Sequence, residues 1–163
     1  MPALQELKAL AHIAVVGVGA TALLDLWLLL LRRLGIPTGS FALIGRWVGH
    51  MQRGRFVHVA INHAEPLRHE AAFGWLTHYA VGIAFAAVLV LLQGPAWLAA
   101  PRLLPALLTG LATVAMPLLL MQPAMGQGVA ASKTPTPLRN VLRNLSNHAV
   151  FGVGLYLAAA LLA

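Results

Sequence analysis

The stretch ALAHIAVVGVGATALLDLWLLLL, residues 9–31, decides the fold of this chain. It is long enough to cross the hydrocarbon core of a bilayer, which takes about 20 apolar residues. Asp25 is the one carboxylate inside it. A charged side chain near the bilayer centre costs roughly 2.5–3.5 kcal/mol on insertion scales, so it normally faces protein or water and finds a partner. The stretch therefore predicts a membrane-spanning helix that carries a polar site.

The composition extends this interpretation to the whole chain. Of 163 residues, 60% are hydrophobic and 9% are charged, whereas soluble globular domains carry about 25% charged residues. We expect an all-α integral membrane four-helix bundle that forms one domain over residues 1–163. The expected membrane helices are 9–31, 71–92, 104–121 and 148–163, joined on one side by loops at 32–70 and 122–147.

The basic residues are concentrated in those two loops. Of 11 Lys and Arg, the two outside them are Lys8 and Arg102. Because cytoplasmic loops carry the excess of basic residues, both loops are predicted to be cytoplasmic. The chain is then a multi-pass protein of a bacterial inner membrane, N-out and C-out. The net charge of +7 indicates topology and contact with anionic lipid, and not binding to nucleic acid.

The loop after the first helix is too rich in apolar residues to be a simple tether. Residues 40–51 have helical spacing, with Ser40 as N-cap, and predict a short interfacial helix on the membrane surface. Pro66 is expected to be the first residue of the second membrane helix. Pro137, which follows Thr136, is expected to begin the fourth helix, whose first part is amphipathic. Pro117 is expected to kink the third helix, because it lacks a backbone donor.

Helical spacing brings polar residues toward the cytoplasmic end of the bundle. Gly17, Thr21 and Asp25 share one face of the first helix, which is expected to meet a neighbouring helix. His78 lies at nearly the depth of Asp25 in the second helix, since each helical residue advances 1.5 Å. His148 opens the apolar part of the fourth helix.

Three interpretations of these residues stay open. Asp25 and His78 form a structural pair, or the acid and the histidines hold a metal, or they relay protons beside a substrate path. The chain has no cysteine, so a metal such as Zn or Fe would need imidazole, carboxylate or thioether ligands. The candidate metal ligands are Asp25, His50, Glu70, His78 and His148, and the candidates for holding a cofactor or substrate are Arg46, Trp47 and Tyr79.

The leading functional hypothesis is a metal-binding protein or membrane-embedded enzyme with a cytoplasm-facing pocket. The alternative is a small proton-coupled transporter or export subunit, which would take a small-molecule substrate and form a homodimer. Metalloprotease, di-iron, hydrolase and phosphate-loop motifs are absent from the sequence, so the pattern assigns no reaction. His58, His63 and His69 are expected to be solvated or interfacial, since their spacing matches no helical ligand pair.

Several segments together resemble a family of small four-helix bacterial inner-membrane proteins of unknown function. They are residues 17–29, 45–51, 74–79, 121–126 and 148–156. The resemblance covers nearly the whole chain. It implies the same membrane topology, and it implies no reaction.

Overall fold

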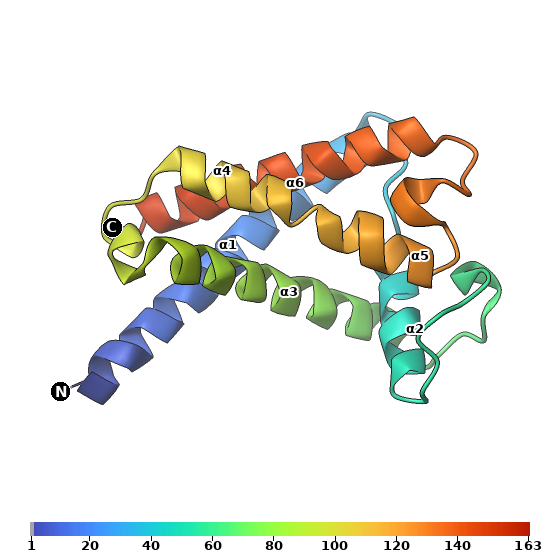
Figure 1. The fold of residues 1–163 in the computed structure, drawn as a ribbon, viewed down its shortest axis with the longest axis horizontal. Coiled ribbons are helices and arrows are strands. Elements are labelled where there is room, and N and C mark those ends of the chain that lie inside the picture. Colours follow the sequence, from blue (N-terminus) through green and yellow to red (C-terminus); the bar gives the residue numbers. More distant parts are fainter. Residues whose placement is uncertain (1) are drawn as a thin grey trace. The chain divides into compact units, whose positions relative to one another are not determined.

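A computed structural model describes residues 2–163, with side chains from Glu6 onward. The described residues form helices and short turns and contain no strand. Short 3-10 and π-helical turns lie between the α-helices. The α-helices are α1 (Pro2–Arg33), α2 (Phe41–Met51), α3 (Glu70–Gln93), α4 (Leu103–Ala112), α5 (Gln122–Ala124) and α6 (Pro137–Ala160) (Figure 1).

Among the described residues, three helices are long and apolar enough to cross a membrane. They are Glu6–Arg33, Glu70–Gln93 and Leu103–Ala124. These three agree with the predicted stretches 9–31, 71–92 and 104–121. The helix α6 is long enough but not apolar enough to be one of them, because its first half carries Arg139, Arg143 and several amides. By length and composition these three helices are candidate membrane spans, and they indicate a membrane protein.

Two of the three helix starts that local residues predict agree with the structure, and one does not. α2 begins just after Ser40, whose backbone is extended, although its side chain makes no capping bond to the described residues. α6 begins at Pro137 as predicted. α3 begins at Glu70 and not at Pro66, because His69 has a φ of 62°. That left-handed conformation cannot continue a helix.

The helix changes type at Pro117, where the sequence predicted a kink. α4 ends at Ala112, and residues Met116–Met121 (η3) form a π-helix that contains the proline. Because proline has no N–H to donate, the regular α-helical ladder cannot pass through it. π-helical turns are rare and occur often at functional sites.

The chain divides into two compact units. The first comprises residues up to Ile36 together with Tyr79–Thr113 and Asn147–Ala163, and the second comprises Pro37–His78 and Val114–Ser146. α3 and α6 therefore each contribute residues to both units.

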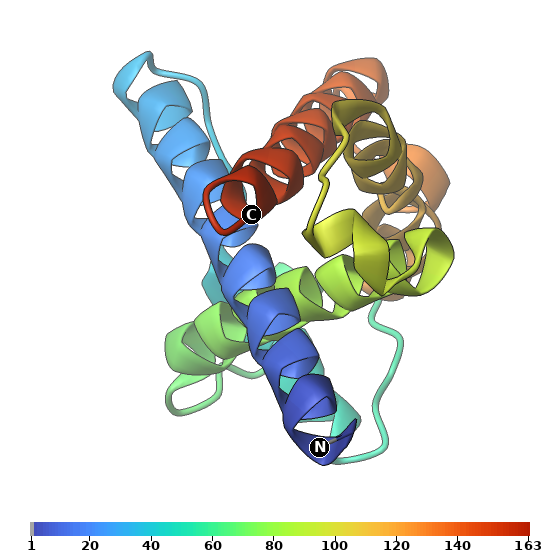
Figure 2. The same ribbon diagram turned by 90° about the vertical axis from the view of Figure 1, so that its left-hand side faces the viewer.

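In the first unit, helices approach one another closely through small residues. α1 crosses α3 (Figure 2), and a methyl group added to Gly17 would lie 2.5 Å from the Cα of Ile83. Gly82 of α3 faces Thr21 in the same crossing. The predicted small-residue face of α1 therefore does meet a neighbouring helix. The buried core beside it consists of Val16, Ala20, Ala86, Leu89, Val90, Trp97, Leu98, Ala106, Phe151, Leu155 and Ala159.

In the second unit, α2 lies against the first turns of α3. Gly45 faces the backbone carbonyl of Glu70, and Gly74 faces that of Phe41. Neither position leaves room for a side chain, so the backbones are in direct contact. The apolar core of this unit is Trp47, Ile61 and Met125, with Leu43, Val48, Met51, Ala64, Met121 and Ala124 packed against it.

Candidate functional site

The acid of the first membrane helix has a hydrogen-bond partner in α3. The hydroxyl of Tyr79 donates to Asp25 Oδ2 over 2.8 Å, and both side chains are partly buried. Asp25 is therefore turned toward protein, as its helical face predicted. The predicted pairing of Asp25 with His78 joins residues of different units and stays a prediction.

A second polar contact within the first unit joins α4 to α6. The Thr113 hydroxyl donates to the carbonyl of Gly110 over 2.6 Å, so its oxygen is free to accept from His148 Nδ1 at 2.9 Å. The same ring nitrogen lies 3.2 Å from the Gly110 carbonyl. Because a carbonyl only accepts, these contacts place a hydrogen on Nδ1 and leave Nε2 of the neutral ring as an acceptor.

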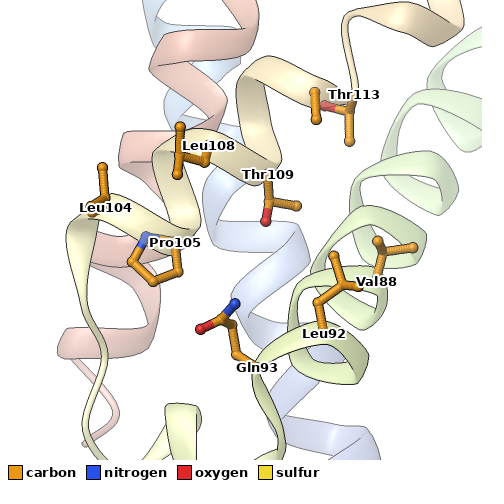
Figure 3. Close-up of a pocket in the computed structure, with 9 residues that line it drawn as sticks. Val88, Leu92, Gln93, Leu104, Pro105, Leu108, Thr109 and Thr113 are labelled. Atoms are coloured by element: carbon orange, nitrogen blue, oxygen red, sulfur yellow. The ribbon is translucent and has the colours of Figure 1, made fainter.

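A groove of about 550 Å³ lies between the second half of α3 and α4 (Figure 3). Its walls are mostly apolar, with three polar side chains among them: Gln93, Thr109 and Thr113. Thr113 is the residue that contacts His148. A small molecule in the groove would therefore be one hydrogen bond away from that histidine. The other lining residues are Val88, Leu92, Leu104, Pro105, Leu108 and Ala112.

Arg46 is the centre of a buried polar cluster in the second unit. Its Nε and Nη2 each lie 2.8 Å from a different carboxylate oxygen of Glu70, and its Nη1 donates to the carbonyls of Ile61, Asn62 and Ala64. The hydrogen bonds to the Glu70 carboxylate raise the pKa of the guanidinium above its ordinary value, against the opposing effect of burial. Arg46 thus connects the 61–64 turn to the start of α3 through hydrogen bonds to both.

Two buried histidines lie beside this cluster. His50 Nδ1 and His58 Nε2 are 2.8 Å apart, and His50 Nε2 lies 3.0 Å from the carbonyl oxygen of Glu65. His50 is 1% exposed and His58 is 6% exposed. Solvation of His58 was therefore a wrong prediction. Its neighbours Val57 and Val59 are 72% and 97% exposed, so the histidine is the buried residue of the three.

A family model matches residues 14–162, nearly the whole chain. The chain belongs to the DUF2938 family of proteins of unknown function. No curated protein and no solved structure matches it. The resemblance predicted from the sequence is thus confirmed as membership of an uncharacterised family.

The predicted metal ligands of this DUF2938 chain are divided between the two units. Asp25 and His148 belong to the first unit, and each has a different hydrogen-bond partner there. His50, Glu70 and His78 belong to the second. Among the described side chains, no group of three or more His, Cys, Asp and Glu is placed to hold a metal ion. Metal binding stays a prediction.

The predicted cofactor or substrate residues of the DUF2938 chain all contact protein groups. The guanidinium of Arg46 binds Glu70 and the 61–64 turn, as described above. Trp47 Nε1 donates to the carbonyl of Phe56 over 2.8 Å, and Tyr79 donates to Asp25. Their contacts hold the fold, and ligand binding by them stays a prediction.

Proposed function

We propose that this protein is a small proton-coupled transporter of a bacterial inner membrane. The observation that carries the proposal is the hydrogen bond from Tyr79 to Asp25, made between two helices of membrane length. An ionisable residue inside a membrane helix is costly, and such residues typically mark ion pathways and proton relays. A carboxylate that accepts a phenol hydroxyl can take up a proton and then donate, so the pair has two hydrogen-bonded states.

The groove between α3 and α4 supports a substrate class for this transporter. Apolar walls with a few polar groups are typical of small-molecule sites of 300–1,000 Å³. The solute would be amphipathic, with an apolar body against Leu92 and Leu108 and a polar group at Thr109 or Thr113. Because Thr113 contacts His148, a bound solute would change the surroundings of a second titratable group.

The proposed transporter crosses the membrane four times. The second half of α6 forms a fourth crossing over residues 148–163, so that both ends of the chain lie outside the cytoplasm. The loops 32–70 and 122–147 are then cytoplasmic, where their basic residues contact anionic lipid. Since a few helices enclose little space, the transporter is proposed to work as a homodimer.

Proton-coupled flux tests the proposal directly. Purified protein is reconstituted into liposomes that contain the pH-sensitive dye pyranine, and pools of small amphipathic solutes are added outside. At least one pool should acidify the lumen with the wild-type protein and not with Asp25→Asn. Glu6→Gln removes an exposed acid from the start of the same helix and should leave the flux unchanged.

The competing function, a metal-binding protein or membrane-embedded enzyme, gives a different result. Elemental analysis of the detergent-solubilised protein would then find stoichiometric Zn or Fe that is lost in Asp25→Asn. Absence of proton movement with every pool and under an imposed membrane potential would contradict transport. Equal flux in the wild type and in Asp25→Asn would show that Asp25 is structural.

A further inference from the structure

Three large apolar side chains are exposed in residues 53–59, the segment that follows α2 in the second unit. Phe56 is 58% exposed, Val57 is 72% exposed and Val59 is 97% exposed. The candidate membrane spans among the described residues end at Arg33 or begin at Glu70 on either side of this segment. Contact of those helices with lipid therefore does not explain the exposure of these three side chains. Clustered apolar side chains on a surface mark a contact with a protein or with a membrane.

The same segment is positively charged. Arg53 and Arg55 precede the apolar side chains, both are exposed, and residues 53–59 contain no acid. Glu65 lies 3.9 Å from Arg53, but both side chains of this pair are largely in water, so the pairing is weak. Arginines next to aromatic and aliphatic side chains are typical of segments that lie on anionic lipid. The charge therefore favours an anionic lipid surface as the partner of the apolar side chains.

The backbone of the segment is held in place by the rest of the second unit. The carbonyl of Phe56 accepts a hydrogen bond from Trp47 Nε1 over 2.8 Å. The backbone N–H of His58 donates to the carbonyl of Ala124 over 2.8 Å, and the His58 side chain is buried. A fixed backbone therefore presents the exposed side chains, and little conformational entropy is lost when they bind a partner.

The position of α2 determines where the segment lies along α3. Gly45 of α2 faces the carbonyl of Glu70, and Gly74 faces that of Phe41, so α2 crosses the first turns of α3 (Figure 1). With α3 as a membrane span, a helix that crosses its start lies along the membrane surface. The 53–59 segment follows directly after α2 and is then at the level of the lipid head groups.

We propose that the 53–59 segment is a lipid-binding loop, in which the three apolar side chains enter an anionic leaflet and the two arginines bind the head-group phosphates. The inference rests on the proposed placement of the loop 32–70 at the membrane, and it goes beyond transport.

The backbone of the loop limits how deep it inserts. The N–H groups of Val57 and Val59 donate to no group of the described residues. Hydrocarbon cannot satisfy a backbone donor, whereas water and phosphate oxygens at the head groups can. We therefore expect the apolar side chains to reach the upper part of the acyl chains while the backbone stays among the head groups.

A fluorescent probe on Val59→Cys tests the insertion. The chain has no cysteine of its own, so the environment-sensitive NBD group is attached at this position alone, and the complete protein is placed in nanodiscs with one copy per disc. In discs of phosphatidylcholine and phosphatidylglycerol, the emission should shift to shorter wavelength. Nitroxide lipids labelled near the head group should quench it more than those labelled near the end of the acyl chain. The same probe on the exposed His63→Cys should report water and be quenched little.

Lipid composition tests the role of the arginines. The fluorescence lifetimes of NBD differ between lipid and water, so they give the ratio of inserted to free loops. In discs with phosphatidylglycerol, Arg55→Gln should lower this ratio about fivefold, which is the effect of one basic residue near an anionic surface. In discs of phosphatidylcholine alone, the same substitution should have no effect. Arg102→Gln removes an exposed arginine between α3 and α4 and should have no effect in either kind of disc.

Three results would overturn the lipid-binding loop. Emission typical of water at position 59 in every disc would show that the loop does not insert. A shift to shorter wavelength without quenching by either nitroxide lipid would show that protein, and not lipid, covers the loop. An inserted fraction that is the same with and without phosphatidylglycerol would exclude the phosphate contacts. None of these measurements depends on proton movement, so failure of the loop and failure of transport are distinguished.

Discussion

Two arginines of the second unit make ion pairs in opposite surroundings. The Arg46 and Glu70 side chains are 10% and 18% exposed and bond through two pairs of atoms, whereas Arg53 and Glu65 are 61% and 72% exposed and 3.9 Å apart. Exposed pairs contribute little because water and salt screen them. Breaking a buried pair is costly, because it leaves a charge without a partner.

Replacement of Arg46 by alanine should therefore destabilise the protein strongly. The change leaves Glu70 and three backbone carbonyls without their donor, and we expect a loss of about 3–5 kcal/mol in the free energy of unfolding. Arg53→Ala is the matched control and should cost less than about 1 kcal/mol. Denaturant titration in micelles measures both. Equal losses in the two variants would contradict the structural role of Arg46.

The contact between Asp25 and Tyr79 gives a second prediction about single residues. Hydrogen bonds between membrane helices average about 0.6 kcal/mol and reach about 1.7 kcal/mol. A double-mutant cycle of Asp25→Ala and Tyr79→Phe should give a coupling energy within this range, measured as the free energy of unfolding in micelles. Additive effects of the two substitutions would show that the hydrogen bond does not stabilise the protein.

Helix contacts in both units depend on glycines that leave no room for a side chain. Gly17 lies against the backbone of Ile83, and backbone cannot rotate away as the end of a flexible side chain can. In contrast, a methyl group on Gly39 would meet no atom of the described residues within 4 Å. The two positions therefore differ in what a side chain would displace.

Substitution of Gly17 by alanine should force α1 and α3 apart. Overpacking costs about 1–3 kcal/mol, and we expect a loss of that size in the free energy of unfolding. Gly39→Ala should change stability by less than about 0.5 kcal/mol. The same denaturant titration serves for both. If the Gly17→Ala protein is as stable as the wild type, α1 and α3 are not in direct backbone contact at this position.

Elements with a local cause were predictable, and those with a tertiary cause were not. Apolar length predicts the presence of α1, and proline chemistry predicts the start of α6 at Pro137 and an irregular helix near Pro117. The start of α3 does not, because it depends on the left-handed conformation of His69. Sequence patterns cannot show that conformation in a residue that is not glycine.

In the candidate site, too, features with a local cause were predictable and features with a tertiary cause were not. The inward direction of Asp25 follows from its helical face, but its partner Tyr79 depends on how α1 and α3 cross. Burial of His58 depends on contact with residues 121–126, far along the chain. Two valines beside a histidine favour burial of the valines on hydrophobicity alone, and both valines are exposed.

In the described part of the chain, the long helices carry many large apolar side chains on the outside, as lipid-facing helices do. Large apolar side chains of the three long helices are exposed, while each helix also has a narrow buried face. In water such a surface would drive aggregation. Examples are Leu10, Leu26, Leu30, Leu76, Leu91, Leu104, Leu108 and Leu119.

The proposed topology can be tested on a chain that has no cysteine. Single cysteines at the exposed positions Arg53, Lys133, Ala100 and Ala163 are offered to a membrane-impermeant maleimide in bacterial spheroplasts. With four crossings and cytoplasmic basic loops, the positions 100 and 163 should be labelled, and 53 and 133 should be labelled only after lysis. If α6 does not cross, position 163 should behave like the loops, because three crossings leave the two ends on opposite sides. Labelling of 53 and 133 in intact spheroplasts would instead reverse the orientation, against the distribution of basic residues.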